Sequence, residues 1–248
     1  MTGLSWPSFP ADAVTYATTM EKSALTRGWE RALAESEVFQ HLPVAAQDEL
    51  IERASLRWLA DGECLFHRGD PADGWYCLLE GALKVSGVSA EGRELALIYL
   101  EPGSWFGEIS LFDGMPRTHD NYAHGDCVLL LLPKAQFRLL LQQHSSLYEA
   151  LMQMHCQRLR MLFAAIEDHS LGTLEQRLLR QLRNLARSYG VSEAEGVRID
   201  FRISQEGLAQ LVGGSRQRVN LELKRMEGAG LLLQRGGQLI LRKAALAG

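Results

Sequence analysis

Hydrophobic positions recur with two different periods along the chain. Between Leu59 and Pro133, short apolar segments are separated by glycines, a pattern typical of antiparallel strands in a sandwich or roll. Glu30–Phe39 and Ala45–Ala54 have helical spacing instead, and so does most of the chain after Ser146. We therefore predict an α+β protein in which an antiparallel β-roll, or jelly roll, is followed by helices.

A long helix is predicted over Ser146–His169. Nearly every position between Leu159 and Ile166 is apolar, which is more than the single stripe of an amphipathic surface helix. One face would pack on the roll and the other on a second copy, so we expect a C2 homodimer through residues 146–169. A core helix fully enclosed within a monomer is the alternative.

Two short helices around a glycine turn are predicted near the C-terminus. Ser204 is a suitable N-cap for the first, Gly213-Gly214 ends it, and Ser215 can cap the second. One side of the second helix is apolar, whereas the other is polar and cationic. This is a helix-turn-helix whose polar face can enter the DNA major groove. We expect that face to consist of Ser215, Arg216, Gln217, Arg218, Asn220, Leu221 and Lys224.

Strands are predicted on both sides of this helix pair. Val197–Ile203 alternates apolar and polar residues, as a half-buried strand does. Leu231–Gln234 and Gln238–Leu241 are joined through Arg235-Gly236-Gly237, which suits a type I′ hairpin turn. Together these segments predict a winged helix-turn-helix.

The charge distribution supports a nucleic-acid partner for the C-terminal third. The whole chain has a net charge of −4. From Thr173 onward it has 13 Lys and Arg against 7 Asp and Glu, a net charge of +6, and the rest carries −10. A basic module attached to an acidic body is what a DNA-binding domain on a sensing domain would show.

A second candidate site lies within the roll, in the segment Phe106–Thr118. Gly107 allows a ligand close to the backbone, and Glu108–Phe112 can form one helical turn whose free N–H groups bind an anion. Arg117 offers a forked cation to a phosphate, Thr118 a hydroxyl, and Glu108 an acceptor for sugar hydroxyls. An internal Glu108–Arg117 ion pair in an empty pocket is the alternative. The expected effector-binding residues here are Gly107, Glu108, Ile109, Ser110, Arg117 and Thr118.

These two signatures, in this order around a long helix, resemble the cAMP receptor protein/FNR (Crp/Fnr) family of bacterial transcription regulators. The resemblance covers roughly residues 35 to 245. It implies an N-terminal extension (1–34), a cyclic-nucleotide-binding-type β-roll (35–143), a dimerisation helix with hinge (144–170) and a winged helix-turn-helix (171–248). It also implies an effector contact at Arg158, double-stranded DNA with an inverted-repeat operator as target, and RNA polymerase as a further partner.

Some positions depart from the family pattern. Leu162 and Phe163 stand where cAMP-binding members have a polar Thr-Ser pair that receives the adenine amino group. The segment Gly107–Thr118, here called the cassette, matches the family's phosphate-binding segment but is one residue shorter than in the cAMP receptor protein. His119-Asp120 follows it where that protein has an apolar pair. The effector therefore stays open between cAMP, another nucleotide such as cyclic di-GMP, and none. Haem is a further alternative, with His41, His67, His119 and His124 as available ligands.

The remaining features favour a cytoplasmic protein that is not an enzyme. The four cysteines, at 64, 77, 127 and 156, are widely spaced, and we expect buried thiols in a reducing compartment rather than disulfides or a metal site. No secretory signal or membrane span is predicted. The sequence shows no P-loop or nucleophile elbow. A regulatory subunit that acts through a protein partner instead of DNA is the competing function.

Overall fold

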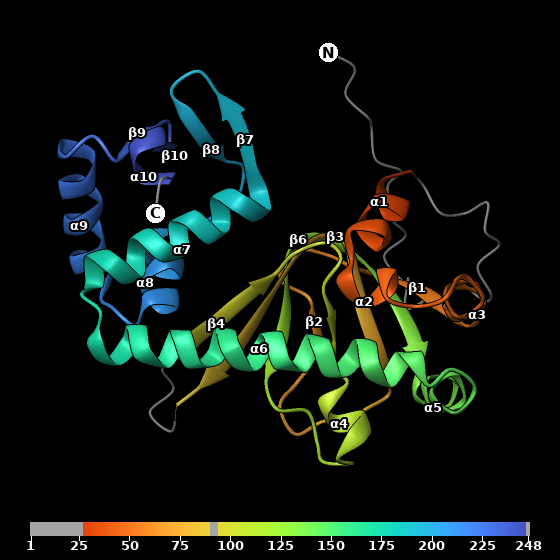
Figure 1. Ribbon diagram of the computed structural model, residues 1–248. Coiled ribbons are helices and arrows are strands. Elements are labelled where there is room, and N and C mark those ends of the chain that lie inside the picture. Colours follow the sequence, from red (N-terminus) through yellow and green to blue (C-terminus); the bar gives the residue numbers. More distant parts are fainter. Residues whose placement is uncertain (1–26, 90–93, 247–248) are drawn as a thin grey trace. The chain divides into compact units, whose positions relative to one another are not determined.

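The computed structural model describes residues 27–89 and 94–246 of the chain (Figure 1). Most of the predicted N-terminal extension therefore lies outside the described residues. The chain divides into two compact units. One, here called the roll unit, comprises residues up to Val85 together with Tyr99–Met154, and the other, the winged-helix unit, comprises Ser86–Ile98 together with His155–Gly248.

The predicted strands between Leu59 and Pro133 form one six-stranded sheet. Its order is β1-β6-β3-β4, with β2 also paired to β6 and β5 to β3. The β1–β6, β2–β6 and β3–β5 pairs are antiparallel, as expected for a roll. The strands are β1 Ser55–Leu59, β2 Cys64–Phe66, β3 Gly74–Val88, β4 Glu94–Leu100, β5 Trp105–Phe106 and β6 Asp120–Pro133.

Two of these strands are longer than the glycine pattern predicts. Gly81 lies within β3 and Gly125 within β6, so reading each of them as a turn between strands was wrong. Both have positive φ, +86° and +75°, a conformation that other residues rarely adopt. A Cβ on Gly81 would lie 2.4 Å from the carbonyl oxygen of Asp126. Glycine here permits a local bend and a close approach between neighbouring strands.

Strand β3 separates two apolar cores. Along it, Trp75, Cys77 and Leu79 belong to a core shared with helices, whereas Tyr76 and Leu78 belong to the interior of the roll. Successive side chains of a strand point to opposite faces, and all five are buried because both faces of β3 are covered. A strand buried on both faces reads as a continuous apolar run, which is the pattern of this segment.

The roll unit is completed by short helices and by the first part of a long one. They are α1 Arg27–Glu35, α2 Glu37–Gln40, α3 Val44–Arg53, α4 Ile109–Phe112, α5 Lys134–Gln143 and α6 Ser146–Leu171. Helix α6, long and uninterrupted in Figure 1, confirms the predicted helix and ends two residues later than expected. Its buried residues, Leu147, Ala150, Leu151 and Met154, all lie in its N-terminal half.

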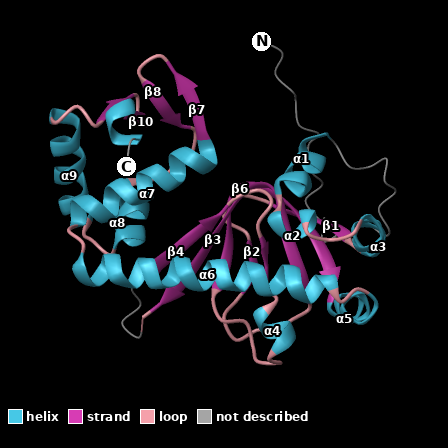
Figure 2. Cartoon of the chain, viewed as in Figure 1, coloured by secondary structure: helices cyan, strands magenta, loops and turns pink. Residues whose placement is uncertain are grey.

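The winged-helix unit combines helices α7 to α10 with a small sheet (Figure 2). Its core is formed by Leu178 and Leu182 of α7, Leu208 of α8, and Val219 and Leu223 of α9, among others. The sheet has the order β7-β8-β10-β9. The elements are α7 Leu174–Tyr189, β7 Gly190–Glu193, β8 Gly196–Ile199, α8 Gln205–Val212, α9 Arg216–Gly228, β9 Leu232–Arg235, β10 Gln238–Arg242 and α10 Lys243–Leu246.

Local sequence signals placed most of these elements correctly. Thr173 and Gln176 form the capping box that opens α7. The strand predicted over Val197–Ile203 is shorter, because β8 ends at Ile199. Its partner β7 was not predicted: all four of its residues are exposed, so it shows no apolar alternation.

The cysteine prediction holds for two of the four side chains. Cys77 and Cys127 are buried, whereas Cys64 is half-buried and Cys156 is exposed on α6, and all four are free thiols. Burial raises the pKa of the Cys127 thiol to about 11. Within the part of the chain that the structure describes, no helix is long and apolar enough to cross a membrane.

Candidate functional site

The helix pair α8–α9 has the capping geometry of a helix-turn-helix. The Ser204 hydroxyl accepts a hydrogen bond from the backbone N–H of Gly207 at 3.0 Å, and the Ser215 hydroxyl accepts one from Arg218 at 3.4 Å. Gly213 ends α8 in the left-handed conformation at φ +61°. The sequence therefore determines the start, the stop and the turn of this motif locally.

The two sides of α9 differ as predicted. Val219, Leu223 and Met226 are buried in the winged-helix core. Of the residues predicted to read DNA, five polar ones are exposed: Ser215, Arg216, Gln217, Arg218 and Lys224. Leu221 is also exposed, at 52 %. Leu221 therefore does not belong to the winged-helix core.

Asn220 is the exception on this face. It is half-buried, and its side-chain oxygen accepts a hydrogen bond from Nε2 of Gln205 on α8 at 3.2 Å. The sequence predicted Asn220 as one of the residues that contact DNA and gave no indication of its contact with Gln205. The NH2 group of Asn220 and the second lone pair of its oxygen are not used in this contact.

The wing has the predicted turn. Gly236 and Gly237 connect β9 to β10 with φ values of +57° and +82°, so both central residues have the positive φ of a type I′ turn. Arg235, at the start of the turn, forms a 2.7 Å ion pair with Glu195 in the β7–β8 turn. This exposed pair joins the two hairpins of the unit.

The second candidate site surrounds α4 in the roll unit. Glu108 and Ser110 are almost fully buried, whereas Ile109 is 48 % exposed and Thr118 is exposed. The Ser110 hydroxyl donates to the carbonyl oxygen of Pro116 at 3.1 Å, which closes the cassette on itself. Because α4 has only four residues, its aligned peptide dipoles are few, and the charge of the site comes mainly from Arg117.

Arg117 lies inside the protein and is only 2 % exposed. Its Nη1 donates to the carbonyl of Gly107 at 2.7 Å, and its Nη2 donates to the carbonyl of Gly74 at 2.9 Å. A Cβ on Gly107 (φ +89°) would lie 2.7 Å from Nη1, so the guanidinium requires glycine there. The ion-pair partner is Asp73, at 2.7 Å, not the Glu108 that the sequence offered as an alternative.

Aromatic rings surround this guanidinium. The Arg117 Cζ atom is 4.3 Å from the ring centroid of Phe66 and 5.7 Å from that of Tyr76. Tyr76 in turn stacks on Phe106 at 5.6 Å. The Tyr76 hydroxyl donates to Asp73 and accepts from Arg57, and burial followed by the nearby Asp73 carboxylate raises the pKa of the phenol.

Arg158 and the four candidate haem histidines were the other effector contacts considered from the sequence. Arg158 is on α6 within the winged-helix unit, so its contact with an effector in the roll stays a prediction. Three of the four candidate haem histidines contact side chains of the protein: His67 with Asp120 at 3.5 Å, His119 with Thr118 at 3.0 Å, and His124 with the Tyr99 ring. Among the described residues, no group of three or more His, Cys, Asp or Glu has an arrangement that could hold a metal ion.

Of the residues that hold Arg117, the sequence indicated Gly107 but not Asp73 or Gly74. Asp73 and Gly74 precede Arg117 by more than 40 positions, and Arg57 lies still earlier in the chain. The segment Gly69–Gly74 reads as a turn, and nothing in its composition connects it to the cassette. Only the pairing of strands brings these segments together.

Comparison with known families identifies both regions. The cyclic nucleotide-binding domain family matches residues 56–144, and the Crp-like helix-turn-helix domain family matches residues 176–248. The chain is 28 % identical over 221 residues to the CRP-like cAMP-activated global transcriptional regulator of Mycobacterium tuberculosis, which covers 86 % of this chain and 99 % of that protein. It is 32 % identical over 154 residues to the global nitrogen regulator of Synechocystis, and the match covers 61 % of this chain and 68 % of that protein.

A solved structure shares the same architecture. That of the c-di-GMP-responsive global regulator CLP of Xanthomonas campestris superposes with a TM-score of 0.68 at 24 % identity, covering 81 % of this chain and 99 % of that one. The fold expected from the sequence, a cyclic-nucleotide-binding-type sheet, a long helix and a C-terminal helix-turn-helix, is thereby confirmed. With both domains matched in order and a relative more than 30 % identical, this chain is a member of the Crp/Fnr family of transcription regulators.

Proposed function

We propose that this regulator is a homodimer that binds an inverted-repeat DNA operator and changes its DNA affinity when a small effector binds in the roll. The observation that carries the proposal is the exposed cationic side of α9, whose Arg216, Arg218 and Lys224 lie outside the core of their own unit. Such a side on the second helix of a winged helix-turn-helix suits the major groove. An effector would stabilise the DNA-competent arrangement of a two-state equilibrium.

The side chains of α9 divide into base-reading and phosphate-binding groups. Arg216, at the first turn, can donate both arms of its fork to O6 and N7 of guanine. Gln217 suits an adenine edge, and Leu221, one turn on, suits a thymine methyl. Arg218 and Lys224 would bind phosphates, which set affinity rather than sequence. Asn220 would contact DNA through its NH2 group, while Gln205 holds its oxygen in place.

The dimer contact is assigned to α6. Tyr148, Met152, Leu159, Leu162 and Ile166 are each more than half exposed. They follow the alternating three- and four-residue spacing of a coiled-coil seam, with His155 at the intervening position. Two copies packed along this seam would cover it. The arrangement would also present two α9 helices to half-sites about one helical turn apart.

The effector is proposed to be a cyclic nucleotide or cyclic dinucleotide. A guanidinium, a buried serine and a glycine backbone in one cassette suit a phosphodiester. Relatives of this chain include a cAMP-activated and a c-di-GMP-responsive regulator, both controlled by such molecules. Leu162 and Phe163 offer no hydrogen bond to an adenine amino group, which argues against cAMP. Arg158 would complete the site.

The functional boundaries follow from this assignment. We retain 1–34 as an extension, 35–143 as the effector domain, 144–170 as the dimerisation helix with its hinge, and 171–248 as the DNA-binding domain. A regulator of this kind acts on the chromosome, in the cytoplasm, with RNA polymerase as the expected protein partner. The basic helix-turn-helix argues against a regulatory subunit that acts only through another protein.

Selection of bound sequences from random duplex DNA tests the proposal. We expect the full-length chain to select an inverted repeat, and fluorescence anisotropy to give tighter binding to it than to scrambled DNA. Selection of only asymmetric sequences, or equal affinity for all duplexes, would rule the proposal out.

A further inference from the structure

A buried amide side chain of the roll has an oxygen without a partner. Asn121 lies on β6 and is only 4 % exposed. Its Oδ1 atom is enclosed and has no hydrogen-bond partner among the described residues. A buried acceptor without a donor costs free energy. If this position served packing alone, an apolar side chain of the same size would be more stable there.

The amide faces the interior of the roll. Asn121 is opposite Phe66 in the antiparallel pairing of β6 with β2, and paired residues lie side by side on one face of a sheet. Phe66 packs against the apolar core of the roll interior. Ala123, two positions further along β6 and therefore on the same face, belongs to that core.

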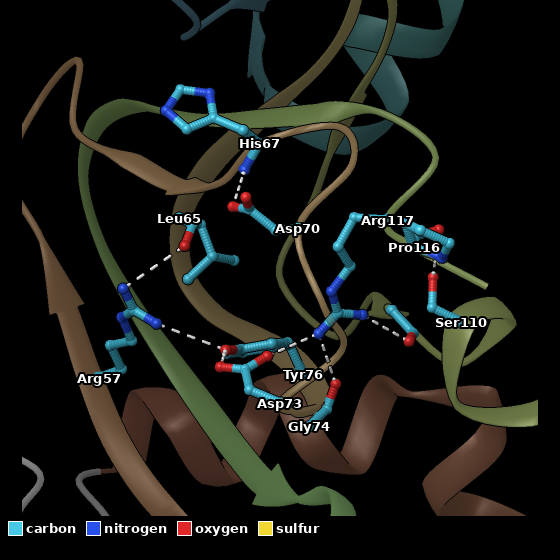
Figure 3. Close-up of polar contacts among 11 residues, drawn as sticks. Arg57, Leu65, His67, Asp70, Asp73, Gly74, Tyr76, Ser110, Pro116 and Arg117 are labelled. Atoms are coloured by element: carbon cyan, nitrogen blue, oxygen red, sulfur yellow. Dashed lines mark hydrogen bonds and ion pairs between the residues drawn. The ribbon is translucent and has the colours of Figure 1, made fainter. Parts of the chain in front are cut away.

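The same interior region contains the cation of the proposed effector site. The Arg117 guanidinium, which points toward Asp73 and Gly74 in Figure 3, has its Cζ atom 4.3 Å from the ring centroid of Phe66. Phe66 is thus a neighbour of both Arg117 and Asn121. An amide with an unused acceptor therefore lies one side chain away from the group that would bind the phosphate.

Resting on the proposed effector site, we propose that Asn121 is a specificity-determining residue that binds the base of the effector. A carboxamide presents an acceptor and a donor side by side. A purine edge presents the complementary pair, N6–H beside a ring nitrogen in adenine and N1–H beside O6 in guanine. The effector is thus a purine nucleotide whose base donates an N–H to Oδ1 of Asn121. A ligand without that N–H is disfavoured, because the oxygen then stays buried and unpaired.

Asn121→Leu tests the assignment in the full-length chain, because leucine has nearly the same shape and makes no hydrogen bond. Titration calorimetry with cAMP, cGMP and cyclic di-GMP should show that the wild type binds at least one of them. The variant should bind that ligand roughly tenfold more weakly. The ligand affected distinguishes adenine from guanine. Thermal stability without ligand should not fall, because the change removes a buried unpaired oxygen, whereas loss of a structural hydrogen bond would lower it.

Asn121→Ala repeats the test without the bulk of leucine and should show the same loss of affinity. Tyr122→Phe is the matched control. Tyr122 is the next residue of β6, and its ring lies on the other face, 5.5 Å from the Lys84 ammonium and 6.0 Å from the His67 ring. Removing its hydroxyl should change the affinity by less than about twofold.

The proposal is overturned if the wild type binds none of the three nucleotides, or if either Asn121 variant binds its ligand as tightly as the wild type. An equal loss in Tyr122→Phe would also overturn it. Failure of the proposed function would appear separately, as a wild-type chain that selects no operator.

Discussion

Arginine has opposite surroundings in the two domains. Arg117 in the roll is enclosed, with two backbone carbonyls, a carboxylate and two aromatic rings around it. Arg216 on α9 is exposed to solvent. A site for a small ligand needs a cation held in fixed geometry, and that geometry requires internal acceptors. A surface that binds a polyanion needs solvent-accessible cations that can replace the counterions around its phosphates. The same type of side chain is therefore held by internal acceptors in the proposed effector site and left in solvent on the proposed DNA-binding surface.

The largest expected effect concerns the dimer that would present two α9 surfaces together. Leu159→Glu combined with Leu162→Glu places like charges along the α6 seam, so we expect monomers and a roughly hundredfold loss of affinity for the operator. Light scattering and anisotropy measure the two outcomes. Met161→Glu is the control, because Met161 is 57 % exposed but lies outside the seam spacing. Dimers that persist in the double variant would place the interface elsewhere.

Removing Arg117 should affect stability more than removing the exposed Arg216 of α9. Arg117→Ala leaves the carbonyls of Gly74 and Gly107 without their buried donor, which should cost about 2–3 kcal/mol of unfolding free energy. The half-exposed Asp73 adds little to this, because solvent screens it. Arg216→Ala should change stability by less than about 0.5 kcal/mol. Urea denaturation of both variants provides the test, and equal losses would contradict the contrast between the two sites.

For DNA affinity, in contrast to stability, we expect the exposed side chains of α9 to matter. Arg216→Ala should cost about 1–3 kcal/mol on the selected operator and relax one base position, with little change on random DNA. Lys224→Ala should weaken all sequences alike and lower the salt dependence by about one unit of slope. Anisotropy across a salt series distinguishes the two. A uniform loss in the Arg216 variant would show that this side chain binds phosphate rather than a base.

The smallest expected effect is that of cAMP. Leu162 and Phe163 cannot receive an adenine amino group, so micromolar cAMP should change the operator affinity of the wild type by less than about twofold. An increase of tenfold or more would show that adenine is recognised by groups other than this pair.

The predictability of the two sites from sequence differs for a physical reason. Caps, glycine turns and helical periodicity are local, so Ser204, Gly213 and Ser215 located the helix-turn-helix directly. The cassette residues Gly107 and Arg117 were also found from a local motif. What Arg117 contacts was not, because Asp73 reaches it only through strand pairing, 44 positions away. The exposed strand β7 was missed because it has no apolar face to detect.

The alternation along β3 gives the roll an optical signal. Tyr76 lies beside Arg117 of the proposed effector site, and the preceding residue, Trp75, is fully buried on the opposite face. The Trp75 indole lies 4.0 Å from that of Trp105 and 5.2 Å from the ring of Phe137, measured between centroids. A backbone shift that moves Tyr76 also moves Trp75, whose emission depends on these neighbours. The chain thus contains a fluorophore next in sequence to a residue of the proposed effector site, on the strand face where a ligand bound there could not quench it by contact.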